Sequence, residues 1–303
     1  MYDICGVGHI TLDKVITPSS VKYMPGGTSY YFSNAIRQMH LNYLLVTSLG
    51  QGEMHTVTSM RAQGITIHAF ESAYSVYFEN IYPENLDHRT QRVLRKADPF
   101  TQEQVKDIRA KIFHLGPLLA DDMSVAFIKD LSERGRVSLD VQGFLRRVDH
   151  LNVVLNDWPA KMETLTCIDI LKANDQEMEM ITGLTDVRAG AALLNEWGVK
   201  EVVITLGSKG SVIYTDGVFY DIPVFVPGHI SDTTGCGDTY MAGYLSQRIL
   251  GKGPQEAGEF ASAMAALKIE TYGPFTGTPN DVFSFMQRQT DDDVSVSNIS
   301  LNR

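Results

Sequence analysis

The sequence lacks the features that mark several large classes of protein. It has three cysteines in 303 residues, Cys5, Cys167 and Cys236, and no Cys-x-x-Cys pair. Their number and spacing argue against a disulfide framework and a zinc site, and they favour a reducing compartment. No run of about 18 uncharged apolar residues occurs, and no basic start precedes a long apolar stretch. We therefore expect an untargeted cytoplasmic protein with no membrane partner.

Positive charge is also scarce. Lys and Arg number 26 against 36 Asp and Glu, which gives a formal net charge of −10. Such a chain repels a phosphate backbone at long range, so we expect no nucleic-acid partner. No pair among the eight histidines has the spacing of a helix-borne metal site. Because 44% of the residues are hydrophobic, the chain can still build a substantial core.

Short apolar runs alternate along the chain with segments whose apolar residues recur at helical spacing. This alternation is typical of βα units around a mostly parallel sheet. The predicted strands cover residues 3–8, 43–49, 65–68, 112–115, 137–141, 168–172, 202–206 and 211–214. The predicted helices begin near residues 27, 53, 101, 122, 175, 186, 235, 254 and 279. We therefore predict an α/β fold with a doubly wound, mostly parallel sheet flanked by helices.

Two segments break this alternation, at about residues 12–24 and 74–97. Their β-compatible residues predict a small separate sheet, which could close over a cleft as a lid and exclude water. Two ordinary surface hairpins are the alternative. Within the second segment Asn80, Arg89 and Arg92 are candidates for substrate contact, although solvated edge-strand residues show the same pattern. An exposed lid edge would also permit a homodimer.

The rest of the domain organisation is simple. We interpret residues 1–290 as a single domain. Residues 291–303 mix Asp, Ser and Asn with isolated apolar residues and lack a helical stripe. We expect them to form a flexible tail.

The most informative motif lies at residues 231–243, where a Gly-x-Gly turn opens a predicted helix. Unpaired backbone N–H groups at Gly235, Cys236 and Gly237, together with the helix dipole, could hold the negative charge of a phosphoryl group. Asp238 in the first helical turn could take the proton from an attacking hydroxyl. The alternative is a glycine turn followed by an Asp at a helix start, where Asp is favoured in any case.

The longer string Asp-Thr-Thr-Gly-Cys-Gly-Asp-Thr, at residues 232–239, resembles the C-terminal signature of the ribokinase-like, or PfkB, carbohydrate kinases. The family usually has Ala in place of Cys236. The resemblance implies a ribokinase-like fold and the transfer of a phosphoryl group from MgATP to a hydroxyl of a small sugar or polyol. It implies that Asp238 is the general base. It also points to a monovalent cation, K⁺, near Asp232 and Thr234.

Two motifs near the N-terminus also resemble the family, and they occur in the order that the family shows. Residues 6–13 resemble its first strand, which ends in the Asp that holds substrate hydroxyls, here Asp13. Gly26 and Gly27 resemble its di-glycine motif at the start of the first helix. A carboxylate that accepts from two neighbouring hydroxyls suits a polyol. The alternative is a strand-ending Asp and a simple glycine turn.

The segment at residues 172–177 resembles the family's Asn-x-x-Glu element. The resemblance implies that Asn174 and Glu177 organise Mg²⁺, largely through its waters, beside the nucleotide phosphates. A helix N-cap at Asn174 with Glu177 three residues later is the alternative, and it could coexist with that role.

Two further segments resemble nucleotide-binding parts of the family. Residues 202–211 resemble the segment that lines the ATP phosphates and ribose, which assigns Thr205, Gly207 and Gly210 to the nucleotide site. Residues 273–279 resemble the loop that closes around the adenine.

The identity of the acceptor is less well defined by the sequence. Ribose-phosphorylating relatives have Asn at the position of Tyr31, whose ring could stack on a substrate or belong to the core. Arg146 could direct positive charge toward the phosphoryl group or pair with an acidic helix. Residues 26–34 and 137–146 look closest to the branch that includes myo-inositol kinases. The alternatives are a nucleoside acceptor and a non-catalytic metabolite sensor; a dinucleotide site is disfavoured because Thr11 replaces the third glycine.

Overall fold

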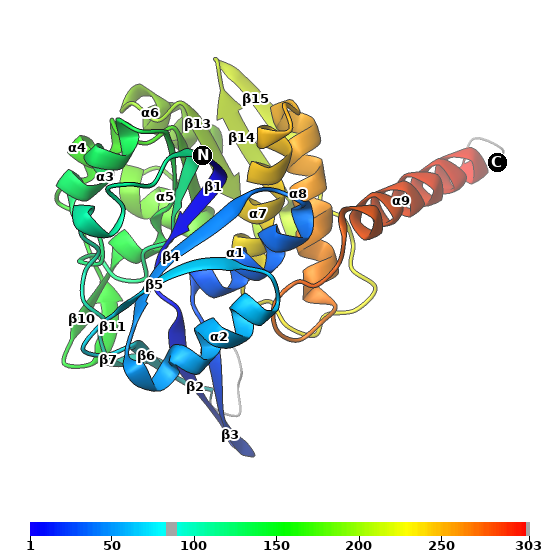
Figure 1. Cartoon of the computed structure of the whole chain (residues 1–303). Helices are drawn as coiled ribbons and strands as arrows, with labels where there is room; N and C mark the ends of the chain where they lie inside the picture. The colour runs from blue at the N-terminus through cyan, green and yellow to red at the C-terminus, as the bar shows by residue number, and fades with distance from the viewer. Residues whose placement is uncertain (83–89, 301–303) are drawn as a thin grey trace.

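The computed structural model describes residues 1–82 and 90–300 of the chain. Within these ranges nine strands form one large sheet (Figure 1). From edge to edge they are β15 (Val218–Ile222), β14 (Ser211–Thr215), β13 (Glu201–Thr205), β12 (Ile170–Asn174), β9 (Arg136–Asp140), β8 (Ala110–Leu115), β1 (Tyr2–Val7), β4 (Tyr43–Leu49) and β5 (Thr66–Glu71). Of these nine strands only β14 runs opposite to the others, and it pairs antiparallel with β13 and β15, so the predicted mostly parallel sheet is confirmed.

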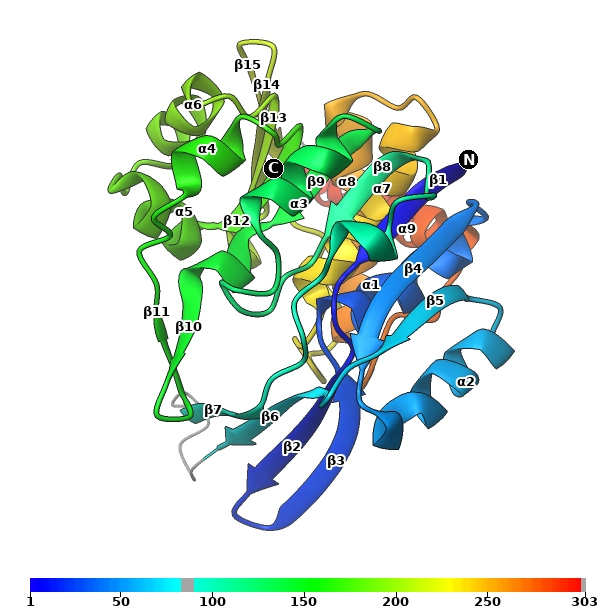
Figure 2. The same cartoon turned by 60° about the vertical axis from the view of Figure 1, so that its left-hand side comes forward.

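Helices cover both faces of this sheet (Figures 1 and 2). Neighbouring residues of one strand point to opposite faces, as Ile4 and Cys5 of β1 do, and each joins a different core cluster. One face packs against α1 (Thr28–Ile36), α2 (Met54–Ala62), α7 (Cys236–Ile249), α8 (Pro254–Ile269) and α9 (Pro279–Ser300). The other packs against α3 (Val125–Ser132), α4 (Lys161–Leu165), α5 (Asp175–Thr182) and α6 (Val187–Glu196). This is the predicted doubly wound arrangement.

A second sheet lies beside the carboxyl ends of the parallel strands (Figure 2). Its order is β10 (Arg146–Asp149), β11 (Asn152–Leu155), β7 (Thr90–Arg95), β6 (Val76–Ile81), β2 (Thr11–Thr17) and β3 (Ser20–Gly26). The sequence predicts a small separate sheet, but it does not predict the β10–β11 hairpin. Arg89, and with it residues 83–89 of the predicted lid, lies outside the described residues.

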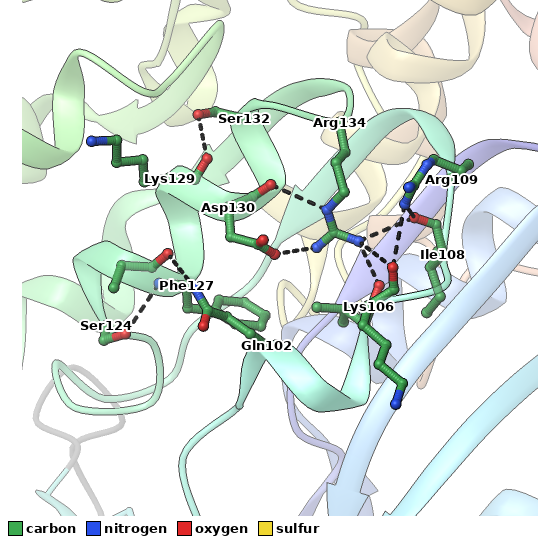
Figure 3. Close-up of polar contacts among 12 residues, drawn as sticks. Gln102, Lys106, Ile108, Arg109, Ser124, Phe127, Lys129, Asp130, Ser132 and Arg134 are labelled. Atoms are coloured by element: carbon green, nitrogen blue, oxygen red, sulfur yellow. Dashed lines mark hydrogen bonds and ion pairs between the residues drawn. The ribbon is translucent and has the colours of Figure 1, made fainter.

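The predicted helix near Thr101 is wrong. The segment forms only the 3₁₀ turn Gln102–Gln104. Arg134, which follows α3, donates to the carbonyl oxygens of Val105 at 2.6 Å and Ile108 at 3.2 Å (Figure 3). Because these carbonyls are bonded to a guanidinium, they do not need the intrahelical partners that a helix would supply.

The C-terminal segment includes residues 291–303, which the sequence predicts to be a flexible tail. The backbone of α9 is helical as far as Ser300, and residues 301–303 lie outside the described part of the chain. Extension of an existing helix costs far less than nucleation, so a helix can continue without an apolar stripe. No helix among the described residues has both the length and the apolar character needed to cross a membrane.

Candidate active site

The N-terminus of α7 forms the centre of the site. Its N-cap, Gly235, has φ 76°, and a Cβ there would overlap the ring of Tyr31 in α1. The helix begins at Cys236, and a Cβ at Gly237 would lie 3.1 Å from Nζ of Lys172. The first-turn N–H groups have no intrahelical acceptors and lie at the positive end of the helix dipole. The predicted anion hole lies at this helix start, between α1 and β12, and one of its three N–H groups, that of Cys236, donates to the carbonyl oxygen of Thr233 at 3.3 Å.

Asp238 lies in this first turn with its side chain only partly exposed. The pKa of its carboxyl is raised to about 7, chiefly by burial and also by the negative charge of Asp140. The positive charges of Lys172 and Arg146 and a hydrogen bond from Thr28 act in the opposite direction. A carboxylate with a pKa near neutrality is well suited to general base catalysis.

A buried ion pair lies directly behind the anion hole. Lys172 is 6% exposed, and its Nζ lies 2.9 Å from Oδ2 of Asp140 and 4.0 Å from Oε2 of Glu177. Burial alone would lower the pKa of Lys172, but the two carboxylates raise it above its ordinary value. The ammonium is therefore a permanent positive charge next to the first turn of α7.

Asn174 and Glu177 form a reciprocal capping box at the start of α5. The N–H of Glu177 donates to Oδ1 of Asn174 at 2.7 Å, and the N–H of Asn174 donates to Oε2 of Glu177 at 2.8 Å. Nε2 of Gln142 lies 3.3 Å from Oε1 of Glu177. Each carboxylate oxygen keeps a free lone pair, so the pair fits contact with Mg²⁺ through water. No three His, Cys, Asp or Glu side chains of the described residues form a metal cage.

Asp13 lies where β2 and β3 lead into α1. Its Oδ1 accepts a hydrogen bond from Oγ1 of Thr11 at 2.6 Å. A Cβ at Gly26 would overlap the Asp13 carboxylate, and Gly27 has φ 88° as the N-cap of α1. Both glycines are therefore required by the close approach of this carboxylate and by the turn into the helix.

Tyr31 lies among these groups but is almost completely buried, with 2% of its surface exposed. Burial raises the pKa of its hydroxyl, and the negative charges of Asp232, Asp13 and Asp238 raise it further. Because its ring packs against Gly235, the geometry favours a supporting role over direct stacking on a substrate.

Among the described residues the structure has two cavities, of which the second is lined by residues of the α7 N-terminus. The first, of about 530 Å³, lies at the second sheet and is lined by Gln91, Arg146, Val153, Val154 and Leu155. The second, of about 580 Å³, extends from the anion hole along the predicted nucleotide segment and brings together Asn174, Thr205, Gly207, Gly210, Cys236 and Gly237. Its far wall is apolar and includes Val224, Phe225, Ile230, Ala265 and Ile269.

The predicted cation-binding residues, Asp232 and Thr234, adjoin one another in the loop before α7. The N–H of Thr234 donates to Oδ1 of Asp232 at 2.9 Å. The other carboxylate oxygen, Oδ2, lies 3.1 Å from Nζ of the buried Lys268. A protein cation therefore already contacts the carboxylate that the sequence assigned to K⁺.

Comparison with known proteins identifies the family. The family model for pfkB family carbohydrate kinases matches residues 7–281. The chain belongs to the PfkB family. A cytidine kinase of Thermococcus kodakarensis is 25% identical over 92% of this chain and 100% of its own length. A ribokinase of Arabidopsis thaliana is 30% identical, over 54% of this chain and 41% of that protein.

Solved structures show the same fold. A pyrophosphate-dependent kinase of the ribokinase family, complexed with a pyrophosphate analog and myo-inositol, superposes with a TM-score of 0.83 at 24% identity, over 93% of this chain and 99% of that one. Arabidopsis thaliana ribokinase with ribose and ATP gives 0.79 at 19% identity, over 94% and 98%. This PfkB protein is therefore a ribokinase-like kinase of a small-molecule substrate.

Sequence reasoning missed the charged groups behind the anion hole of this PfkB protein. Asp140 lies next to the end of the predicted strand 137–141, Lys172 ends the predicted strand 168–172, and Lys268 lies near the end of the helix predicted to begin near residue 254. The carboxyl ends of adjacent parallel strands meet at one edge of a sheet, so Asp140 and Lys172 could have been placed there from the strand predictions alone. No comparable signal exists for Lys268.

Proposed function

We propose that the chain transfers the γ-phosphoryl group of MgATP to a hydroxyl of a small sugar or polyol. The observation that carries this proposal is the Asp238 carboxylate, with a pKa near 7, in the first turn of α7, where Cys236 and Gly237 line the nucleotide-side cavity. Asp238 accepts the proton of the acceptor hydroxyl as the oxygen attacks phosphorus. The backbone N–H groups at Gly235 to Gly237, together with Lys172, stabilise the negative charge that develops on the phosphoryl oxygens.

The other predicted residues have supporting tasks. Asp13 accepts hydrogen bonds from acceptor hydroxyls over Gly26 and Gly27, and Arg146 adds positive charge from the lid side. Asn174 and Glu177 would hold Mg²⁺ through its waters, and the metal supplies charge neutralisation between the phosphates when bound. The second sheet acts as the lid, which excludes water from the transfer.

The large nucleotide-side cavity favours ATP as the donor. Thr205, Gly207 and Gly210 line it near the anion hole, while its far wall is apolar. An apolar wall suits a nucleobase, whereas pyrophosphate, the donor of one structural neighbour, has no apolar group to place there.

Two further proposals concern the oligomeric state and the cellular location of the protein. Val21 and Tyr23 are 53% and 61% exposed on β3, which is the last strand of the second sheet. Exposed apolar residues on an edge strand support a homodimer through the lid. All three cysteines are free thiols, which supports a cytoplasmic location.

ADP release from MgATP, measured against a panel of cyclitols, pentoses, hexoses and nucleosides, tests the proposed activity. We expect turnover with one polyol or sugar class and a much lower rate when pyrophosphate replaces ATP. Turnover with nucleosides alone would favour the second candidate, which the similarity to a cytidine kinase supports. ATP binding with no turnover against any acceptor would favour a metabolite sensor.

The pH dependence of catalysis follows from the raised pKa of Asp238. The base acts only when ionised, so kcat/KM should fall as pH decreases through about 7, the pKa of the carboxyl in the free enzyme. An unperturbed Asp would keep the rate constant down to about pH 4. Initial rates across this range check the prediction, and a profile that stays flat through neutrality would remove Asp238 as the titrating base.

A further inference from the structure

The strongest unexplained feature of the molecule is the environment of Lys268. This residue lies in the last turn of α8 and is completely buried. Its Nζ donates to the carbonyl oxygen of Asp232 at 2.8 Å, to Oδ2 of Asp232 at 3.1 Å and to the carbonyl oxygen of Thr271 at 3.5 Å. The three N–H bonds of the ammonium therefore have three oxygen acceptors.

These contacts join three segments beside the active site. Asp232 Oδ2 also accepts the N–H of Gly273 at 3.3 Å, and Asp232 Oδ1 accepts that of Thr234. The N–H groups of Ser231 and Asp232 donate to the carbonyl of Ile269 at the end of α8. The ammonium thus fixes both the turn at residues 271–273 and the loop that leads into Gly235 and the anion hole.

The oxygens around Nζ form the kind of site that a monovalent cation would use. They comprise carbonyl oxygens and a carboxylate near the negative end of a helix dipole. A free K⁺ bound to Asp232 would share its ligands with the Lys268 ammonium. Two positive charges would then lie within a few ångströms of one another with a single carboxylate between them. The residues present therefore do not fit the K⁺ site that the sequence resemblance implies.

We propose that the Lys268 ammonium replaces a free monovalent cation, so that the kinase works without K⁺. This inference rests on the proposed phosphoryl transfer for its activity readout. Because the Lys268 ammonium is part of the chain, its effective concentration at these oxygens does not depend on the salt in the medium. The site therefore needs no ion from solution. Lys268 is accordingly a positioning residue, which acts on the anion hole through Asp232 and the loop that follows it.

The first test measures the initial rate of the wild-type enzyme in buffers in which K⁺ is replaced by tetramethylammonium at constant ionic strength. We expect less than about a twofold change with K⁺. The Lys268→Ala variant removes the ammonium and leaves a space lined by oxygens. Its rate should fall about tenfold or more without K⁺ and recover in part when K⁺ is added, with a lower response to the bulkier cation.

Two further variants sharpen this test. Lys268→Met removes the charge but fills the space, so we expect loss of activity without recovery in K⁺. Lys252→Ala is the matched control, because Lys252 is 48% exposed and its ammonium pairs with Glu256 on the surface. It should behave as wild type. A wild-type rate that rises several-fold with K⁺, or a Lys268→Ala variant that remains active and insensitive to K⁺, would overturn the proposal.

Thermal unfolding separates this inference from the proposed function. K⁺ should leave the Tm of the wild-type protein unchanged and raise that of Lys268→Ala, because an ion that binds only the folded state stabilises it. This readout needs no substrate. Absence of phosphoryl transfer with every acceptor would reject the proposed function but not the role of Lys268. A Tm of the wild-type protein that depends on K⁺ would reject the role of Lys268 but not the proposed function.

Discussion

Asp238→Asn is expected to lower kcat by about 100- to 10,000-fold, the usual contribution of a general base. The amide keeps the shape of the side chain but cannot accept the hydroxyl proton at neutral pH. The donor cavity is lined mainly by other residues, so ATP binding should change little. Steady-state rates with the best acceptor of the panel, together with calorimetric titration of ATP, measure the two quantities separately.

Glu256→Gln is the matched control for this variant. Glu256 also lies in the first turn of a helix, α8, but its side chain is 63% exposed and pairs with Lys252 on the surface. It should retain the wild-type kcat. If Asp238→Asn were as active as this control, the carboxylate would not be the base and another group would have to accept the proton.

Lys172→Met should destabilise the fold by about 3–5 kcal/mol, because it leaves the carboxylate of Asp140 buried without its partner. The loss would appear as a lower midpoint of urea unfolding. The ammonium also lowers the pKa of Asp238, so its removal should move the low-pH limb of the kcat/KM profile to higher pH.

The double variant Lys172→Met/Asp140→Asn distinguishes the two effects. Removal of both charges eliminates the unpaired Asp140 carboxylate, although Glu177, 4.0 Å from Nζ of Lys172, still loses the ammonium, so a large part of the lost stability should return. The pH profile should also move back toward that of the wild type, because Asp140 raises the pKa of Asp238 while Lys172 lowers it. A single variant as stable as wild type, with an unchanged pH profile, would contradict the role of this pair.

The sequence predicted those parts of the structure in which the local pattern of apolar residues matches the burial of the element in the fold. Strands buried on both faces give continuous apolar runs, as at residues 43–49 and 202–206, and both lie in the large sheet. The motif around Asp238 was recognisable from its Gly-x-Gly turn and the longer string at residues 232–239, and in the structure Gly235 has the positive φ that glycine adopts readily. The family comparison confirms the assignment that the motif suggested.

The features that the sequence missed depend on tertiary contacts. The β10–β11 hairpin turns at His150 and Leu151, with φ 44° and 72°, and neither is the glycine or asparagine that usually marks such a turn. The segment after Thr101 has carbonyls bonded to Arg134, which lies about 30 positions away in the chain. Lys268 meets Asp232 across 36 positions, and nothing in the spacing of the two residues indicates that contact.

The contact between Gly235 and Tyr31 connects the second sheet, on the proposed acceptor side, with the anion hole, on the proposed donor side. Gly26 ends β3, and α1 begins two residues later, so the second sheet continues directly into the helix that carries Tyr31. At Gly235 this helix meets the loop of the anion hole with no space for even a methyl group. A shift of the sheet on acceptor binding would therefore reach the donor side through this contact. Acceptor and donor affinities should be reciprocally coupled, each ligand strengthening the binding of the other by the same factor.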